Sequence, residues 1–248
     1  MKHNWTSIIY DIYTYVYWEP QTIDCLRKGN KKYNNESEMI EALHKREVVF
    51  NHICNVFLTS LNTDQITHFF NRIVDGKKYM EDFYRIYVRD LSDVVAFDNV
   101  SNPTQPDIFL IGDNNTISIE LKIGAKSDQQ QILKYAFLHS QEYKKSGIKK
   151  NHNLILLGKG GRSNFWKEKY DSVIDLKIKC INDIDQLQTK YLPYKDDIIK
   201  MMHELDIHYI SYNDWYHYLQ EYAIGIGDKK IQKNYNDFMK EIKIRNLL

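Results

Sequence analysis

Closely spaced cysteines are missing from this chain, and their absence excludes two classes of small domain. The three cysteines, Cys25, Cys54 and Cys180, lie far apart and form no C-x-x-C pair. Disulfide frameworks and zinc knuckles both need cysteines or histidines paired at short spacing. The sequence therefore indicates ordinary reduced thiols.

Long apolar runs and flexible linkers are scarce as well. No segment approaches the ~20 apolar residues that a membrane helix needs, and the first residues combine no basic cluster with a sustained apolar stretch. The four prolines stand singly, and no Gly/Ser/Pro-rich tract divides the 248 residues. We therefore expect a soluble, cytoplasmic protein without a membrane partner, folded as a single domain over residues 1–248.

A large excess of positive charge is also missing, because the formal net charge is only +1. Dedicated nucleic-acid binders are often strongly basic. The charge is nevertheless uneven, since residues 144–169 contain eight Lys or Arg residues and a single acid, Glu168. This stretch is expected either to contact phosphates or to form a lysine-rich, solvated surface. The candidate phosphate-binding residues are Lys144, Lys145, Lys149, Lys150, Lys159 and Arg162.

Two apolar runs flank a turn sequence of glycine, aspartate and asparagine at residues 112–115. These residue types tolerate the positive φ of a tight hairpin. If the two central residues form the loop, Gly112 pairs with Asn115, and the same register places Asp107 opposite Glu120. Directly opposed residues have Cβ atoms about 4.5–5.5 Å apart. Two carboxylates that close repel each other, and a divalent cation between them is the usual solution.

The second apolar run of this hairpin alternates apolar and polar residues. Period-2 geometry places its Ile and Leu residues on one face and Ser118, Glu120 and Lys122 on the other. One face can then pack in a core while the other presents charged groups. Lys122 can hold an anion or a water beside a metal bound at Glu120. The alternative is a surface hairpin with solvated charges.

A helix is predicted directly after this run. Ser127 followed three residues later by Gln130 is typical of a helix N-terminus, and helical apolar spacing follows. Gln131, Tyr135 and His139 recur every four residues, so they lie on one stripe that can face the charged side of the hairpin. They could equally be ordinary helix-surface residues. The neighbouring, core-facing stripe is expected to contain Leu133, Ala136, Phe137 and Tyr143.

An acidic residue interrupts an apolar stripe earlier in the chain. Residues 35–61 predict one long helix whose apolar stripe runs from Leu43 to Phe57, and Glu47 falls in the middle of it. An ionised carboxylate on a core-facing stripe costs several kcal/mol unless it is paired or bound to a cation. Glu47 is therefore a candidate site residue, with a buried ion pair or a rotated helix as the alternatives.

Together these residues resemble the PD-(D/E)xK nuclease superfamily, which has the restriction-endonuclease-like fold. Pro106-Asp107 matches the P-D motif, and Glu120-Leu121-Lys122 matches E-x-K. Residues 131–135 match the Q-x-x-x-Y motif of the RecB-like subgroup. Glu47 is similar to the glutamate on the first helix of these families. The resemblance covers about residues 38–160.

The resemblance implies an α/β fold with an α-β-β-β-α-β core, in which a mixed sheet is flanked by helices. A helical N-terminal extension would precede the core over residues 1–37, and a further strand and helices would follow it over 161–248. The implied elements are an early strand at 83–89 or 94–97, strands at 107–111, 116–123 and 153–157, a helix at 128–143 and a later strand at 208–212.

The same resemblance implies metal-dependent hydrolysis of phosphodiester bonds, most directly in DNA. Asp107, Glu120 and the backbone carbonyl of Leu121 would hold Mg²⁺ or Mn²⁺, with Glu47 completing the acidic cluster. Lys122 would orient the attacking water and stabilise charge on the phosphate. On the following helix, Gln131 would steady Lys122 or the phosphate, and Tyr135 would fix that face of the helix.

The sequence leaves the oligomeric state and the biological role open. Cutting both strands of a duplex would favour a homodimer, and restriction, phage defence or DNA repair are roles suggested by the family alone. The alternative from another class is a nuclease-like module that binds nucleic acid or a protein without cutting. A scaffold that binds no nucleic acid is a third, and it would show no salt-dependent affinity for DNA.

Overall fold

The structure is a computed structural model that describes residues 5–6, 36–73, 84–85, 100, 106–124, 126–161, 165–166 and 170–248. Its packing forms two compact units. Unit 1 comprises Met1–Ser60 and Tyr212–Leu248, and unit 2 comprises Leu61–Ser211. The expected single domain stays a prediction, and most of the expected N-terminal extension lies outside the described residues.

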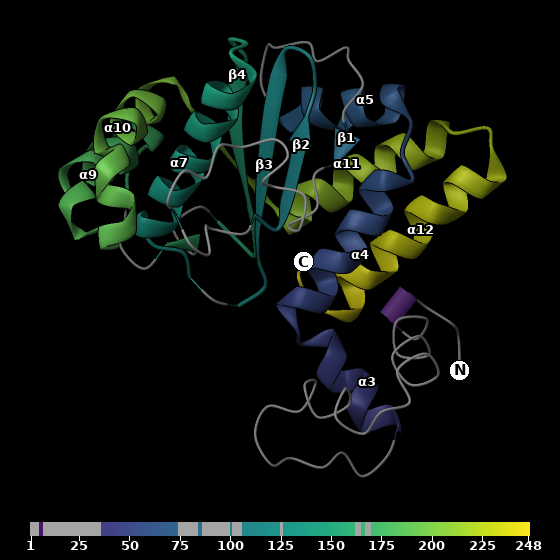
Figure 1. The fold of residues 1–248 in the computed structure, drawn as a ribbon. Helices are drawn as coiled ribbons and strands as arrows, with labels where there is room; N and C mark the ends of the chain where they lie inside the picture. Colours follow the sequence, from purple (N-terminus) through teal and green to yellow (C-terminus); the bar gives the residue numbers. More distant parts are fainter. Residues whose placement is uncertain are drawn as a thin grey trace. The chain divides into compact units, whose positions relative to one another are not determined.

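Unit 2 is built on a mixed β-sheet (Figure 1). In the described part of the chain the strand order is β1-β2-β3-β4-β5. The strands β1, β2 and β3 pair antiparallel, whereas β3, β4 and β5 pair parallel. The expected α/β fold with a mixed sheet and flanking helices is confirmed. The strands are β1 (Tyr84–Arg85), β2 (Ile108–Ile111), β3 (Asn115–Lys122), β4 (Asn151–Gly158) and β5 (Asp206–Ser211).

The strand predictions are confirmed within two residues at each end for β2 to β5. Of the two alternatives for the early strand, 83–89 contains the short β1, and 94–97 lies outside the described residues. β4 is apolar along most of its length and buried from His152 to Gly158. A strand of this kind is typical of the middle of a parallel sheet, whose two faces are both covered.

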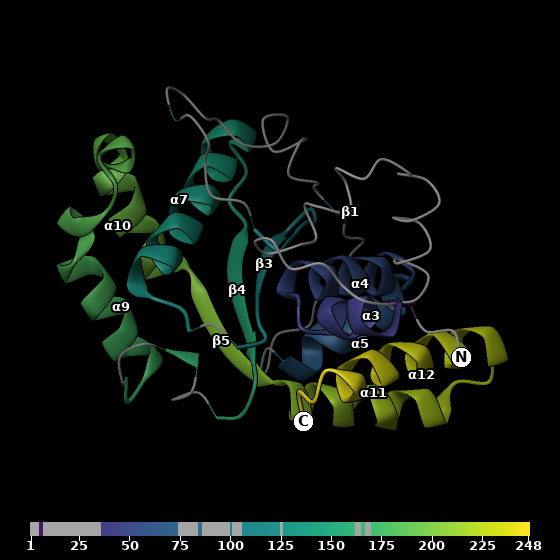
Figure 2. The same ribbon diagram turned by 90° about the horizontal axis from the view of Figure 1, so that it is seen from below.

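Helices connect the parallel strands of unit 2. α7 (Gln129–Ser146) joins β3 to β4, and α9 (Val173–Asn182) and α10 (Lys195–Glu204) lie between β4 and β5. Figures 1 and 2 show these three helices on one face of the sheet. Two short 3₁₀ helices separate α9 from α10, and α5 packs against β5. Their bounds are η2 (Ile184–Gln186), η3 (Thr189–Tyr194) and α5 (Thr63–Ile73).

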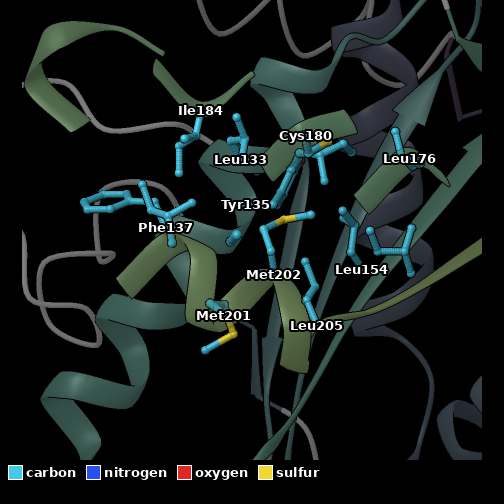
Figure 3. Close-up of a cluster of buried hydrophobic side chains, with 14 of the residues drawn as sticks. Leu133, Tyr135, Phe137, Leu154, Leu176, Cys180, Ile184, Met201, Met202 and Leu205 are labelled. Atoms are coloured by element: carbon cyan, nitrogen blue, oxygen red, sulfur yellow. The ribbon is translucent and has the colours of Figure 1, made fainter. Parts of the chain in front are cut away.

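The hydrophobic core of unit 2 fills the space between α7, α9, α10 and the sheet (Figure 3). Leu133 and Phe137 of α7 are buried here with Cys180 of α9 and Met202 of α10. Leu133 and Phe137 lie on a different side of α7 from Gln131 and Tyr135, which contact Glu120 of β3. α7 is therefore buried on two sides, which fixes its position on the sheet.

Unit 1 contains helices from both ends of the chain. Its aromatic core includes Phe57, whose ring stacks on Phe238 with 4.1 Å between the ring centroids. A buried ion pair joins Arg245 Nη1 to Glu241 Oε2 at 2.5 Å, and both side chains also hydrogen-bond Thr6. The buried charges are thus paired, as buried charges need to be. The helices are α3 (Glu36–His44), α4 (Glu47–Thr59), α11 (Tyr212–Gly225) and α12 (Lys229–Ile244).

The single helix predicted over residues 35–61 is wrong, because the chain leaves the helical conformation between α3 and α4. Arg46 is extended, with φ −89° and ψ 118°. Leu43 and Phe57 are buried as predicted, but the break places Glu47 in the first turn of α4, half-buried. A carboxylate there is stabilised by the N–H groups of the helix start, so it does not have to be buried in an apolar stripe.

Membrane-spanning helices were not expected. Among the helices in the described ranges, none is both long enough and apolar enough to cross a membrane.

Candidate active site

The hairpin register predicted from the sequence is confirmed. Gly112 N–H donates to the carbonyl of Asn115 at 2.8 Å, and Ile108 pairs with Ile119. Continuing this register by one residue places Asp107, which directly precedes β2, opposite Glu120. The two carboxylates of the P-D and E-x-K motifs therefore come from neighbouring strands at one end of the sheet.

Asp107 ties the start of β2 to β3. Its Oδ2 atom accepts a hydrogen bond from the backbone N–H of Leu121 at 2.8 Å. The side chain is half-buried. Asp107 therefore has a structural role in closing the hairpin, in addition to any role it has as a metal ligand. The expected contribution of the Leu121 carbonyl to a metal site stays a prediction.

Both faces of β3 are covered, which corrects part of the sequence interpretation. The alternation is as predicted, with Ile117 and Ile119 on one face and Ser118 and Glu120 on the other. However, all four residues are buried. The expectation of an openly presented polar face is wrong for Ser118 and Glu120, because α7 lies over that face. Only Lys122, at the end of the strand, is half-buried.

Glu120 is the centre of the buried polar network. It is 1% exposed, and side chains of β3 and α7 contact its carboxylate. Gln131 Nε2 donates to Oε1, Tyr135 OH donates to Oε2 at 2.5 Å, and Lys122 Nζ lies 2.5 Å from Oε1. Such charge-assisted contacts offset the cost of removing a carboxylate from water. The order of the motifs in the sequence thus becomes one connected set of side chains in space.

Gln131 and Tyr135 contact Glu120, and this differs in detail from the roles that the resemblance implied. Gln131 was expected to steady Lys122 or a phosphate, whereas its amide donates to Glu120. Tyr135 was expected to fix the helix face, and its hydroxyl anchors α7 to β3 through the same carboxylate. Both residues therefore act on the acidic residue of the E-x-K motif.

The start of α7 also differs from the prediction. Asp128, not Ser127, is the N-cap residue, and its side chain accepts a hydrogen bond from Gln131 N–H at 3.2 Å. A carboxylate is favoured there because it satisfies a free N–H group and faces the positive end of the helix dipole. Ser127 is one residue further out, and its hydroxyl donates to Gln131 Oε1 at 2.9 Å.

The polar stripe on α7 continues along β3 beyond Glu120. His139 Nε2 lies 2.8 Å from Ser118 Oγ, and His139 Nδ1 lies 2.9 Å from Thr116 Oγ1. Thr116 Oγ1 also lies 2.7 Å from Nδ1 of His152, on β4. Sequence reasoning placed His139 on this stripe but missed Thr116 and His152. Thr116 stands two residues before Ser118 and so shares its face, which is a signal that period-2 counting could have used.

The helical stripe ends before Tyr143. This residue was predicted to face the core, but it is 37% exposed. It lies about one turn of α7 beyond His139, which contacts Ser118 and Thr116. Leu133, Ala136 and Phe137, the other members of the predicted core stripe, are buried.

Burial shifts the pKa values of three groups along this interface. The pKa of Tyr135 is raised well above its usual value by burial and by the negative charges of Glu120 and Asp107. Burial, with a smaller contribution from His152, holds the pKa of His139 well below its usual range. Burial and the nearby Lys150 lower the pKa of His152 to about 4. Tyr135 therefore remains a hydrogen-bond donor, and both imidazoles are neutral at neutral pH.

The candidate phosphate-binding residues are divided between the two ends of the parallel strands, which form opposite edges of the sheet. Because β3 and β4 are parallel, Lys122 lies beside Gly158 at one edge, with Lys159 directly following. Residues 144–150 end α7 and lead into Asn151, at the other edge. The 18 residues of α7 span about 27 Å between these edges, at 1.5 Å per residue. Arg162 lies outside the described residues.

Two of these cations are held by carboxylates. Lys144 Nζ lies 2.5 Å from Asp197 Oδ2 in a partly exposed pair. Lys150 Nζ lies 3.0 Å from Glu142 Oε1, and the two side chains are only 6% and 2% exposed. A buried ion pair is costly to break. The buried pair with Glu142 therefore argues against a phosphate contact for Lys150. The phosphate contacts expected of Lys145, Lys149 and Lys159 stay predictions.

Glu47 belongs to unit 1, whereas Asp107, Glu120 and Lys122 belong to unit 2. Its expected place in the acidic cluster therefore stays a prediction. Within the described ranges, no group of three His, Cys, Asp or Glu side chains is arranged to hold a metal ion. A metal at Asp107 and Glu120 would accordingly need backbone or water oxygens as its further ligands.

Comparison of the chain with protein-family models, with curated proteins and with solved structures finds no match. The resemblance to the PD-(D/E)xK superfamily thus rests on the four motifs of the sequence. Any proposal for the function therefore depends on these motifs and on the contacts of Glu120.

Proposed function

We propose that this chain is a metal-dependent nuclease with a restriction-endonuclease-like core, acting on phosphodiester bonds and most directly on DNA. The observation that supports it best is the placement of Asp107 opposite Glu120, with Lys122 on the same face of β3. Over the described residues from Ile108 to Gly158, the order β2-β3-α7-β4 agrees with the β-β-α-β part of such a core. The contacts of Gln131 and Tyr135 with Glu120 add a second, independent agreement with the motif order.

The residues fit Mg²⁺ or Mn²⁺ by their chemistry. Carboxylates are hard oxygen ligands, and Mg²⁺ is commonly held by one or two of them while it keeps several waters. The opposed carboxylates of Asp107 and Glu120 would gain from a cation between them. The carbonyl of Leu121 is the proposed backbone ligand. When bound, such an ion would polarise a phosphoryl oxygen and acidify a water.

Lys122 is the proposed cationic group of the reaction. Its ammonium lies 2.5 Å from Glu120 Oε1 and is mostly shielded from solvent. From there it would orient the attacking water and stabilise the negative charge that develops on the phosphate. Tyr135 and Gln131 each hold one oxygen of Glu120, so the carboxylate keeps one orientation while Lys122 exchanges partners.

The substrate would approach at the sheet edge that carries Lys122. Lys159 follows β4 at the same edge and is exposed, so it is the first candidate for a phosphate contact. Lys145 and Lys149 at the opposite edge could contact only a substrate about 27 Å long or more. Glu47 as a further acidic ligand, a homodimer that cuts both strands, and a cytoplasmic location remain parts of the proposal.

A nuclease-like module that binds nucleic acid without cutting it is the second candidate. The observation that favours it is the network around Glu120, in which Lys122, Gln131 and Tyr135 already balance the buried charge. Asp107 likewise accepts the N–H of Leu121. A site with these contacts could persist as a purely structural element.

The two candidates predict different results in one experiment. The protein would be incubated with supercoiled plasmid, linear duplex and single-stranded DNA, each with Mg²⁺ and with EDTA. A nuclease gives products with Mg²⁺ and none with EDTA. Intact DNA that is retarded in a gel supports the binding module. Intact DNA that is not bound at low salt contradicts both, since a phosphate-binding surface is most attractive there.

A further inference from the structure

Ser127 contacts the candidate active site although it belongs to none of its motifs. The sequence predicted it as the N-cap of α7, but Asp128 has that role. The Ser127 hydroxyl instead donates to Gln131 Oε1 at 2.9 Å, and the residue is 1% exposed. Ser127 thus has a buried hydrogen bond that the capping of α7 does not require.

This hydrogen bond helps to hold the Gln131 amide in the orientation that Glu120 requires. The amide has an oxygen that accepts and a nitrogen that donates, and an ionised carboxylate only accepts. With Ser127 bound to Oε1, the NH₂ group faces Glu120 and donates to it. In the reverse orientation the amide oxygen would face the carboxylate and repel it. The carboxylate therefore selects this orientation, and the Ser127 hydroxyl holds the amide in it from the oxygen side.

The main chain of Ser127 is fixed independently of Gln131. Its N–H donates to the carbonyl of Phe165 at 2.8 Å, and it forms a parallel bridge with Trp166. Phe165 and Trp166 are themselves buried. The hydroxyl is thus presented from a backbone that this bridge holds in place, which is what a precise second layer of contacts requires.

We propose that Ser127 is a positioning residue of the candidate active site, which orients Gln131 and through it the carboxylate of Glu120 for a divalent cation. The inference rests on the proposed function for its metal and adds a residue outside the recognised motifs. Outer contacts of this kind commonly change metal affinity by 10–100-fold when they are removed.

Two variants test the role of the hydroxyl. Ser127→Ala removes it, and Ser127→Thr keeps it with one more methyl group. Ser140→Ala is the matched control, because Ser140 is a buried serine within α7, and its hydroxyl donates to the carbonyl of Phe137. Circular dichroism would establish that each variant is folded before it is compared.

The first readout needs neither metal nor nucleic acid. In protein labelled with ¹⁵N-glutamine, the side-chain NH₂ signal of Gln131 is identified by its loss in Gln131→Glu. We expect Ser127→Ala to move this signal toward the position of a solvated amide, and Ser127→Thr and Ser140→Ala to leave it in place. An unchanged signal in Ser127→Ala would overturn the inference.

The second readout is Mn²⁺ affinity, measured by electron paramagnetic resonance. Ser127→Ala should weaken it by about 10–100-fold, and Ser127→Thr should restore most of it. Equal affinity in Ser127→Ala and wild type contradicts positioning for a cation. The two hypotheses fail separately: absence of DNA cleavage by the wild type counts against the proposed function, whereas the Gln131 signal tests Ser127 without any cleavage.

Discussion

Replacing Tyr135 with phenylalanine removes one hydroxyl from the centre of the candidate site and leaves the ring in place. That hydroxyl donates to Glu120 Oε2 at 2.5 Å, in a position where Tyr135 is 0% exposed. A hydrogen bond to a charged group contributes about 1.5–3 kcal/mol. We therefore expect Tyr135→Phe to lower the free energy of opening α7 from β3 by about 2 kcal/mol, because Glu120 loses a donor that water cannot replace.

The assay is hydrogen exchange of the α7 backbone amides, followed by mass spectrometry. It reports on this helix directly, whereas a global unfolding curve would combine the two units. A loss of about 2 kcal/mol corresponds to roughly 30-fold faster exchange in the regime where opening is at equilibrium. Tyr194→Phe is the matched control, because it removes a hydroxyl from a partly exposed tyrosine whose ring packs on Phe137 of α7.

The result that would refute this reasoning is equal protection of α7 in Tyr135→Phe and wild type. It would mean that the Tyr135 hydroxyl does not hold the carboxylate. Equal acceleration in Tyr135→Phe and Tyr194→Phe would be just as damaging, because the effect would then not depend on the contact of the hydroxyl with Glu120. The expected pattern is fast exchange in the first variant alone.

Two further predictions follow from the histidine pair and from the lysines. Because the pKa values of His139 and His152 are lowered in the folded state, the unfolded chain binds protons first, so stability is full above about pH 6.5 and is lost as the pH falls toward 4. His152 alone should account for about 3 kcal/mol between pH 8 and pH 4, measured from hydrogen exchange of the α7 amides in urea. The variant His203→Gln, at an exposed position, should keep the same pH dependence. A stability that is flat across this range contradicts the burial of neutral imidazoles. For DNA, Lys159→Ala should reduce the slope of log affinity against log salt by about one. Lys150→Met should leave this slope unchanged, because the amine of Lys150 is paired with Glu142. Fluorescence anisotropy at several salt concentrations measures both slopes, and a reduced slope for Lys150→Met would contradict the buried pair.

The hairpin and its register could be predicted from the sequence because their causes are local. Turn residues at 112–115 and the alternation along β3 fix which residues are neighbours across the strands. The placement of Asp107 opposite Glu120 follows from counting alone. The stripe of Gln131 and Tyr135 was likewise visible, because helical periodicity needs no tertiary information.

Other features depend on contacts between distant segments, and the sequence did not reveal them. That α7 covers the polar face of β3 became clear only from the fold, and so did the partnership of His139 with His152, thirteen residues apart on different elements. The buried pair of Lys150 and Glu142 removes one residue from what reads as a uniform basic stretch. The break at Arg46, before Glu47, is likewise not marked by helical periodicity.

The most direct test of the nuclease proposal compares the wild type with Lys122→Ala on supercoiled plasmid in the presence of Mg²⁺, with EDTA as the blank. Removing Lys122 takes an ion-pair partner from the buried Glu120, so circular dichroism must first show that the variant is folded. We predict nicked or linear plasmid with the wild type and Mg²⁺, no products with EDTA, and none with Lys122→Ala. Equal cleavage by the variant, or intact plasmid with the wild type, would contradict the assignment.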